Sequence, residues 1–325
     1  MLVISRDEVR ALLDLDALID ALAVAMSDLS AGRASVPTRI GASAPERDGI
    51  LAAMPGYVPS LGALTAKLVT LFPHNSDLPT HQAVILSFDP QTGQPIALMD
   101  GTEITAVRTG AGSALSARLL AREDASVLAI LGTGVQARSH ARAMVRVRPI
   151  REIRVAGRDP AKARAVADEL SDLGADVHAT ASYEEASLGA DIVCATTHAP
   201  DPVVRRAWLS PGAHVTSVGF NPNGREVDDE TIVDASVCVE SRAAILAPLP
   251  AGSNDLIEPI RAGVIGEDHI QAEIGELVLG SRAGRTSDEQ TTLYKSVGVA
   301  VQDAAAASLV LAAAREQGAG RELEI

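Results

Sequence analysis

A glycine-rich stretch in the middle of the chain has the residue types and the spacing needed to hold a phosphate group. Residues 127–131 read Val-Leu-Ala-Ile-Leu, an apolar run typical of a buried strand, and lead directly into Gly132-Thr133-Gly134-Val135-Gln136-Ala137. In a dinucleotide site the first glycine permits a tight turn, the second lets the pyrophosphate approach the backbone, and the small third residue lets helix and strand pack closely. The helix expected next would offer free N–H groups to the anion. Gly132, Thr133, Gly134, Val135 and Gln136 are therefore the predicted cofactor-binding loop, although such a turn also occurs without a ligand.

The end of the next expected strand bears on which dinucleotide is bound. NAD sites carry an Asp or Glu there, which binds the ribose hydroxyls. This strand ends Val155-Ala156-Gly157-Arg158-Asp159, so a glycine occupies the acidic place and Arg158 follows it. Because a guanidinium pairs well with a phosphate, Arg158 favours NADP(H) over NAD(H). In the alternative interpretation Arg158 only stacks on the adenine, or Asp159 only caps the next helix.

The segments around this loop alternate between short apolar runs and helix-like stretches. Strands are expected at residues 153–156, 192–195, 214–218 and 237–239, and Asp159-Pro160 has the cap and the proline that open a helix. Continuous apolar strands that alternate with helices predict a parallel sheet with both faces covered. Residues 120–297 are therefore expected to form a Rossmann-type dinucleotide-binding domain.

The rest of the chain has a different pattern. Apolar residues recur at helical spacing through the first forty residues, with no Gly or Pro before Gly32, which predicts a helix. From residue 37 to residue 97, short apolar runs are separated by Gly, Pro, Asn and Asp, as in an antiparallel sheet. Long helices are expected over 102–122 and 299–315. The predicted fold class is α/β, with a smaller α+β domain made of residues 1–119 and 298–325.

Composition excludes several classes of function. The chain has 325 residues, of which 47% are hydrophobic and 22% charged, as in a globular protein. Its net charge of −14 and its seven aromatic residues (one Trp, three Tyr, three Phe) argue against a nucleic-acid partner. The longest apolar run, 304–314, is about half of what a bilayer requires. Acidic residues near the N-terminus argue against a signal peptide, and two isolated cysteines suit no metal site, so we expect a cytoplasmic protein without a metal or a membrane partner.

Several further stretches, taken in order, are similar to the ornithine cyclodeaminase/mu-crystallin family. Besides the glycine-rich loop they are Phe72-Pro-His-Asn-Ser, Pro79-Thr-His-Gln-Ala83, Thr105-Ala-Val-Arg-Thr-Gly-Ala-Gly-Ser113, Val218-Gly-Phe-Asn221 and Tyr294-Lys-Ser-Val-Gly298. The resemblance covers nearly the whole chain. It implies a homodimer, a nicotinamide cofactor, and a substrate-binding and dimerisation domain built from the N-terminal part and the last helix.

The resemblance also implies three basic residues at the substrate. Arg108 resembles the arginine that pairs with an amino-acid carboxylate, for which a planar guanidinium is well suited. Lys67 resembles the lysine beside the same carboxylate and the reacting carbon, and Arg39 is the third candidate. Independently, a lysine within the apolar run around Lys67 calls for an explanation, because desolvation disfavours its charge. The alternatives are an edge-strand charge for Lys67 and a helix-surface residue for Arg108.

One position departs from the cyclodeaminases, which carry an aspartate in the loop that follows residues 216–218. Here the loop reads Gly219-Phe220-Asn221-Pro222, with Asn221 at or next to that place. An amide can orient a substrate nitrogen by hydrogen bonds, but it cannot accept a proton at neutral pH. Asn221 and Lys67 are therefore the predicted catalytic residues of a reaction other than cyclising deamination.

The favoured hypothesis is an NAD(P)-dependent oxidoreductase that reduces a small α-imino acid to the α-amino acid, or runs the reverse dehydrogenase reaction. Arg39, Lys67 and Arg108 would bind the substrate, and Lys67 would pass a proton to its nitrogen. An ornithine or lysine cyclodeaminase is the first alternative. A non-catalytic protein that binds the cofactor or another small ligand is the second.

Overall fold

The structure of the protein is a computed structural model, which describes residues 1–324. By its internal contacts the chain divides into two units. Unit 1 comprises Met1–Arg108 and the chain from Val299, and unit 2 comprises Thr109–Gly298. The first boundary between them falls within helix α3 (Gly101–Leu120). Ile325, the last residue of the predicted smaller domain, lies outside the described residues, and the functions assigned to the two domains stay predictions.

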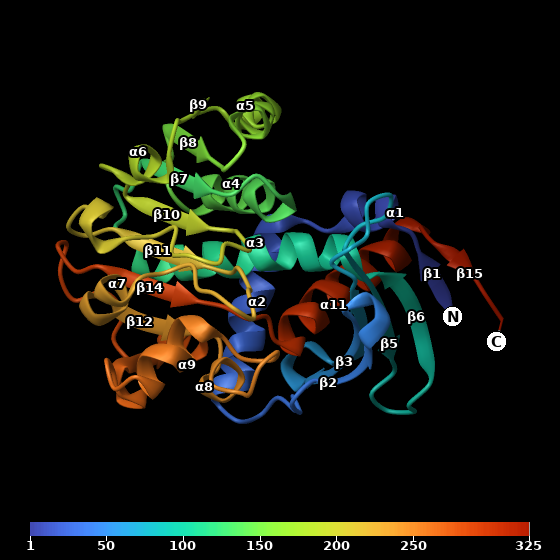
Figure 1. Cartoon of the computed structure of the whole chain (residues 1–325). Helices are drawn as coiled ribbons and strands as arrows, with labels where there is room; N and C mark the ends of the chain where they lie inside the picture. Colours follow the sequence, from blue (N-terminus) through green and yellow to red (C-terminus); the bar gives the residue numbers. More distant parts are fainter. Residues whose placement is uncertain (325) are drawn as a thin grey trace. The chain divides into compact units, whose positions relative to one another are not determined.

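Unit 1 contains a mixed seven-stranded sheet of order β15-β1-β6-β5-β4-β3-β2. Its elements, besides the first half of α3, are β1 (Leu2–Ile4), α1 (Arg6–Leu12), α2 (Leu15–Ser30), β2 (Ile40–Ala44), β3 (Gly49–Val58), β4 (Ala63–Leu71), β5 (His81–Phe88), β6 (Pro95–Asp100), α11 (Ala300–Gln317) and β15 (Arg321–Glu322). From β2 to β6 each strand pairs antiparallel with the next one along the chain, which confirms the antiparallel sheet predicted over residues 37–97, whereas β1 pairs parallel with β6. Figure 1 shows helix α11, in red, beside these strands, and α11 contacts α2, β3 and β4.

The single helix predicted at the start of the chain is two helices. Helix α1 ends at Leu12, and Leu13 is extended, with ψ of 96°. Asp14 then caps α2, because its side chain accepts a hydrogen bond from the Ala17 amide. The helical spacing of the apolar residues continues through the break, so periodicity alone does not predict it. Asp14, a residue type that often caps a helix, was the sequence feature that could have indicated it.

Unit 2 contains an eight-stranded parallel sheet of order β13-β12-β14-β11-β10-β7-β8-β9. Its elements, besides the second half of α3, are β7 (Val127–Leu131), α4 (Val135–Val147), β8 (Glu152–Ala156), α5 (Pro160–Glu169), β9 (Asp176–Ala179), α6 (Tyr183–Ser187), β10 (Ile192–Ala195), β11 (His214–Ser217), α7 (Asp229–Asp234), β12 (Ser236–Val239), α8 (Arg242–Ile245), α9 (Asn254–Arg261), β13 (Ile270–Glu273), α10 (Ile274–Val278) and β14 (Thr292–Lys295).

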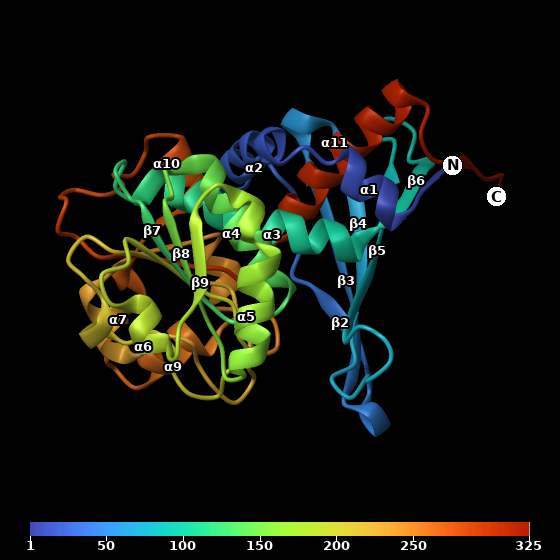
Figure 2. The same ribbon diagram turned by 90° about the horizontal axis from the view of Figure 1, so that it is seen from above.

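Both faces of the unit 2 sheet are covered. Apolar residues of α4 and α5 form one buried cluster with strands β7, β8 and β10, while α6, α7 and α9 contribute to a second cluster on the other face. Figure 2 shows α4 and α5 on one side of the sheet and α6 and α7 on the other. The order β9-β8-β7-β10-β11 is the 3-2-1-4-5 part of the 3-2-1-4-5-6 order of a dinucleotide-binding sheet, and β14, which follows β12 and β13 along the chain, occupies the sixth place. The predicted α/β fold with a Rossmann-type domain is confirmed.

Among residues 1–324, no helix is long and apolar enough to cross a membrane.

Candidate active site

The predicted cofactor loop lies where the first strand of the Rossmann order meets its helix. Strand β7 ends at Leu131, and Gly134 is the residue that caps α4. Gly132 has a φ of 130°, and a Cβ there would lie 2.5 Å from the Thr196 Oγ1 atom. Only glycine fits this turn, because both the backbone conformation and the neighbouring strand end exclude a side chain.

The same loop has the space and the polar groups that a phosphate requires. A Cβ built on Gly134 would meet no atom within 4 Å, so the backbone is open to an approaching group. Helix α4 has thirteen residues, and its first N–H groups and its dipole favour an anion at this end. The buried Oε1 atom of Gln136 accepts no hydrogen bond from residues 1–324. Val135 is exposed and Ala137 is buried, as expected for a loop that opens outward while its helix packs on the sheet. These residues fit a dinucleotide.

Arg158 is the second residue after strand β8, behind Gly157, and is exposed to solvent. Asp159 behind it caps α5, accepting hydrogen bonds from the amides of Ala161 and Lys162. The Asp159 carboxylate therefore caps the helix, which is the role that the alternative interpretation gave to this residue. A Cβ on Gly157 would meet the Thr133 Cγ2 atom at 2.5 Å, so the acidic residue of an NAD site could stand at this position only if the Thr133 side chain moved.

Lys67 of β4 and Arg108 of α3, two of the predicted substrate-binding cations, both form ion pairs with the carboxylate of Asp303. Lys67 Nζ is 2.7 Å from Asp303 Oδ2, and Arg108 Nε donates to Asp303 Oδ1 at 3.1 Å. Arg108 also donates to Gln302 Oε1 at 2.8 Å. The side chains of Lys67 and Asp303 are 2% and 1% exposed, so Lys67 is not an edge-strand charge, and buried Arg108 is not a helix-surface residue.

Burial shifts the proton affinity of both members of this pair. Desolvation, together with repulsion from Arg108 and Arg39, outweighs the attraction of Asp303 and lowers the pKa of Lys67 to about 8. Burial opposes ionisation of Asp303 as well, but the charges and hydrogen bonds of Lys67 and Arg108 hold the pKa of that carboxyl below its ordinary value. Asp303 is therefore an anion at neutral pH, and Lys67 is a cation that can release its proton.

Two more residues of unit 1 complete the charges around Lys67. Arg39, in the segment before β2, is half-buried, and its charge lowers the pKa of Lys67. His81, at the start of β5, has its pKa lowered to about 4 by burial and by the charges of Lys67 and Arg108. With His81 neutral at pH 7, the cations of Lys67, Arg108 and Arg39 outnumber the anion of Asp303, and the cluster suits an anionic ligand.

Asn221 lies in the loop after β11, and both ends of its side chain are engaged. Its Nδ2 atom donates to the His198 carbonyl oxygen at 3.0 Å, and its Oδ1 atom accepts from the Asn223 amide at 2.9 Å. Neither neighbour, Phe220 or Pro222, is acidic. The predicted contact of Asn221 with a substrate nitrogen stays a prediction, and the structure gives the amide a role in shaping the loop.

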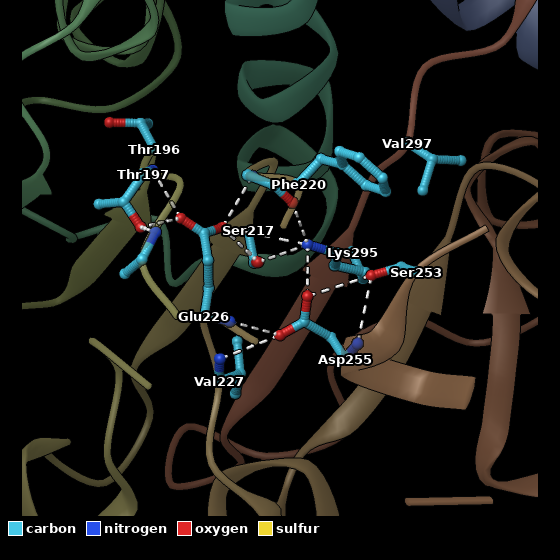
Figure 3. A network of polar contacts seen from close by, with 12 residues as sticks. Thr196, Thr197, Ser217, Phe220, Glu226, Val227, Ser253, Asp255, Lys295 and Val297 are labelled. Atoms are coloured by element: carbon cyan, nitrogen blue, oxygen red, sulfur yellow. Dashed lines mark hydrogen bonds and ion pairs between the residues drawn. The ribbon is translucent and has the colours of Figure 1, made fainter. Parts of the chain in front are cut away.

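Sequence reasoning missed Asp303 in unit 1 and a group of buried charges in unit 2. Figure 3 shows this second group: Glu226, Asp255 and Lys295 point toward one another beside Ser217 and Thr197, at the carboxyl ends of β10, β11 and β14. We name these five residues, together with Ser253, the strand-end network. A charged residue inside an apolar run was the available signal, since Asp303 stands within an alanine-rich helix and Lys295 follows Leu-Tyr.

Within residues 1–324, no group of three or more His, Cys, Asp or Glu side chains is placed to hold a metal ion.

Comparison with known proteins agrees with this geometry. The family model of the ornithine cyclodeaminase/mu-crystallin family matches residues 1–318. The chain belongs to this family. One relative, the Δ(1)-pyrroline-2-carboxylate reductase of Bacillus cereus, is 37% identical over 329 aligned positions that cover 100% of both chains.

Two solved structures of family relatives have the same fold. The Δ(1)-pyrroline-2-carboxylate reductase of Thermococcus litoralis, in complex with NADH and L-proline, is 38% identical, with a TM-score of 0.95 over 99% of this chain and 100% of that one. An archaeal alanine dehydrogenase dimer with bound NAD is 31% identical, with a TM-score of 0.91 over 100% of this chain and 99% of that one.

Proposed function

We propose that the protein is an NAD(P)H-dependent reductase of small α-imino acids, able to run the reverse amino-acid dehydrogenase reaction. The observation that carries this proposal is the buried cluster of Lys67, Arg108 and Asp303, which combines an excess of positive charge with a lysine of lowered pKa. Relatives that match along the whole chain are named for reduction of a cyclic imino acid, and one of them holds NADH and L-proline.

The substrate carboxylate would bind to Arg108 and Lys67, with Arg39 as the third cation. A bound reduced nicotinamide would supply a hydride to the imine carbon, and the imine nitrogen would then need one proton. Lys67 can supply that proton, because at neutral pH it is largely protonated yet its pKa of about 8 is close to the working pH. Asp303 would keep the ammonium in place and charged. For Asn221 we propose that it shapes the loop after β11 through its contacts with His198 and Asn223.

The cofactor would lie on the loop Gly132–Gln136 and the first turn of α4. We infer a preference for NADP(H), supported by exposed Arg158 after β8 and by Gly157 in place of an acidic residue. NAD(H) occupies the two solved relatives described above, so both cofactors belong in the test.

We also infer that the protein is a homodimer and works in the cytoplasm. Exposed apolar side chains on the unit 1 sheet, those of Ile40, Leu51 and Val84, support the dimer, as does the dimeric alanine dehydrogenase relative. Cys194 and Cys238 are free thiols, as in a reducing compartment.

The direct test is absorbance at the nicotinamide band, with NADPH and NADH run separately. Substrates would be the cyclic imines that yield proline and pipecolate, and pyruvate, glyoxylate and oxaloacetate paired with ammonia or methylamine. We expect cofactor oxidation that depends on the imine, and for Lys67→Ala a loss of about 10²–10⁴-fold in turnover while the cofactor still binds. Near-normal turnover of that variant would contradict the role of Lys67. Ammonia release from ornithine without net cofactor oxidation would instead establish a cyclodeaminase, and cofactor binding without either reaction would establish a binding protein.

A further inference from the structure

The strand-end network buries more negative than positive charge. Lys295 Nζ donates to Ser217 Oγ at 2.9 Å and to the Gly219 carbonyl at 2.9 Å, and lies 2.8 Å from Asp255 Oδ2. Glu226 Oε2 is 4.0 Å from the same ammonium. All three charged side chains are buried. Two carboxylates therefore face one ammonium, and one negative charge is left over.

In the network both oxygens of Glu226 and both oxygens of Asp255 accept hydrogen bonds, an arrangement that suits the charged carboxylate form. Glu226 accepts from the Thr197 amide and hydroxyl on one oxygen, and from the Ser217 hydroxyl and the Gly219 amide on the other. Asp255 accepts from the amides of Glu226 and Val227, and on its other oxygen from Ser253 and Lys295. The backbone amides and the Lys295 ammonium among these partners can only donate, so they favour an oxygen that carries no proton. A third buried carboxylate, Glu240 at the end of β12, accepts from Ser296 and from the amides of Val297 and Gly298, which adds to the negative charge.

The place of the network in the sheet connects this charge to the cofactor. In the Rossmann order the first three strands carry one half of a dinucleotide and the last three carry the other half, outside their carboxyl ends. The network stands at the carboxyl ends of β10, β11 and β14, the last three strands of that order. Thr196, next to Thr197 of the network, is also the residue that a Cβ on Gly132 would strike. The end of β10 therefore contacts the cofactor loop through Thr196 and the buried charges through Thr197.

We propose that the negative charge of the strand-end network shifts cofactor binding in favour of the oxidised form. The nicotinamide ring is a cation in the oxidised cofactor and neutral in the reduced cofactor, so the network attracts only the oxidised ring. By the rule for the Rossmann order, the adenine half would lie on β7 to β9 and the nicotinamide half on β10, β11 and β14, so the nicotinamide would be the part of the cofactor nearer to the network. A fixed negative charge in a water-poor site also stabilises positive charge as it develops, which assists donation of a hydride. This inference rests on the proposed function, because it requires a nicotinamide cofactor on this sheet.

The test measures dissociation constants of the oxidised and the reduced cofactor for the full-length protein, by calorimetry, without substrate. Glu226→Gln and Asp255→Asn each remove one negative charge, and Lys295→Met removes the positive charge. One unit charge about 10 Å away, at an effective dielectric constant of about 20, changes an affinity roughly tenfold. We expect the preference for the oxidised over the reduced cofactor to fall about tenfold in Glu226→Gln and in Asp255→Asn. In Lys295→Met this preference should rise.

Two controls separate charge from damage. ADP-ribose, which lacks the nicotinamide, should bind all variants with unchanged affinity, and Asp124→Asn removes an exposed carboxylate ahead of β7 and should leave the ratio unchanged. If a network variant does not fold, Glu240→Gln removes a buried charge one strand away and should move the ratio toward the reduced form. A ratio within twofold of the unsubstituted protein in every folded variant would overturn the inference, even if imine reduction is intact. Failure of the unsubstituted protein to bind either cofactor form would overturn the proposed function as well.

Discussion

In unit 1, Asp303 binds the two cations that a substrate carboxylate would also use. It is held by Lys67 at 2.7 Å and by Arg108 at 3.1 Å, so a ligand arrives at an arrangement that is already fixed. A single anion cannot neutralise Lys67, Arg108 and Arg39 together, which leaves charge for the substrate. We therefore propose that Asp303 is a positioning residue whose effect is exerted through Lys67.

Replacement of Asp303 by the isosteric Asn should move the pH dependence of turnover. If Lys67 supplies the proton, as proposed above, the rate of reduction should fall as the pH rises through about 8. Without the carboxylate nothing opposes desolvation, and the pKa of Lys67 falls further. We expect the basic limb of the kcat profile to move to lower pH by roughly one unit or more, and the free energy of unfolding to drop by about 3–5 kcal/mol. Glu316→Gln, an exposed acid on the same helix, is the matched control. A limb that stays near pH 8 in the variant would show that Asp303 does not act on Lys67.

Arg158 gives a second prediction at the scale of one side chain. If its guanidinium pairs with a 2′-phosphate, Arg158→Ala should raise the KM for NADPH by about ten- to a hundredfold, as expected when one ion pair to a phosphate is lost. The KM for NADH should change by less than about threefold. Initial rates with each cofactor at saturating imine measure both values, and Arg164→Ala, on the helix that follows, serves as the control. Equal effects on the two cofactors would mean that Arg158 contacts a part that both share.

Among the secondary-structure elements, those whose buried apolar residues recur at a regular spacing along the chain were predictable. Strands β7, β8, β10, β11 and β12 and the Asp159-Pro160 helix start follow from local composition, since a continuous apolar run and a cap each have a local physical cause, whereas the short strand β9 was not predicted. The short strands β13 and β14 and the pairing of Lys67 with Asp303 were not predictable from the residues alone. They depend on partners that are distant in sequence, and no local pattern contains that information.

Helix α3 is tied to its neighbours in unit 2 by two buried histidines. His140 of α4 lies 2.9 Å from the Ser113 hydroxyl, and its Nδ1 atom bonds the Gln136 carbonyl at the cofactor loop. His214 of β11 lies 3.1 Å from the Ser116 hydroxyl and 2.9 Å from Thr292. Burial lowers the pKa of His140 to about 4 and that of His214 to about 3. Both rings are therefore neutral in the folded protein at any pH near neutrality.

These histidines predict acid destabilisation of unit 2. In the unfolded chain each ring takes up a proton near pH 6.5, whereas the folded protein resists protonation until about pH 4 and pH 3. The contribution of these two histidines to the free energy of unfolding is thus fully present above about pH 6.5. It is lost as the pH falls, by up to about 1.4 kcal/mol per pH unit for each histidine. Urea unfolding between pH 7.5 and pH 4.5 measures the slope. The slope should be shallower in His140→Gln and in His214→Gln, and unchanged in His178→Gln, a half-exposed histidine of β9. An undiminished slope in both buried variants would assign the acid sensitivity to other groups.

For the whole molecule, the sheet of unit 1 presents an apolar surface on the side opposite to Lys67. Paired positions in neighbouring strands point to the same face, and Ile40, Ala53, Leu68 and Val84 form one such row across β2, β3, β4 and β5. Ile40 is 71% exposed and Val84 41%, and Leu51, two residues from Ala53 on the same face, is 44% exposed. A contiguous apolar surface of this kind is a typical protein interface, and a self-complementary one forms a twofold dimer.

A charge in the middle of this row should separate the proposed dimer. Val84→Asp places a carboxylate on an exposed apolar position of β5, where it costs little in the isolated chain but would be desolvated in an interface. We expect the unsubstituted protein to sediment as a dimer and Val84→Asp to sediment as a monomer at micromolar concentration. Its thermal unfolding should also become independent of protein concentration, because only a dimer is stabilised by mass action. Val264→Asp, at an exposed apolar position of unit 2, is the control and should remain dimeric. If Val84→Asp sediments like the unsubstituted protein, the dimer uses another surface; if the unsubstituted protein is itself monomeric, this face of the sheet has no second copy to cover it.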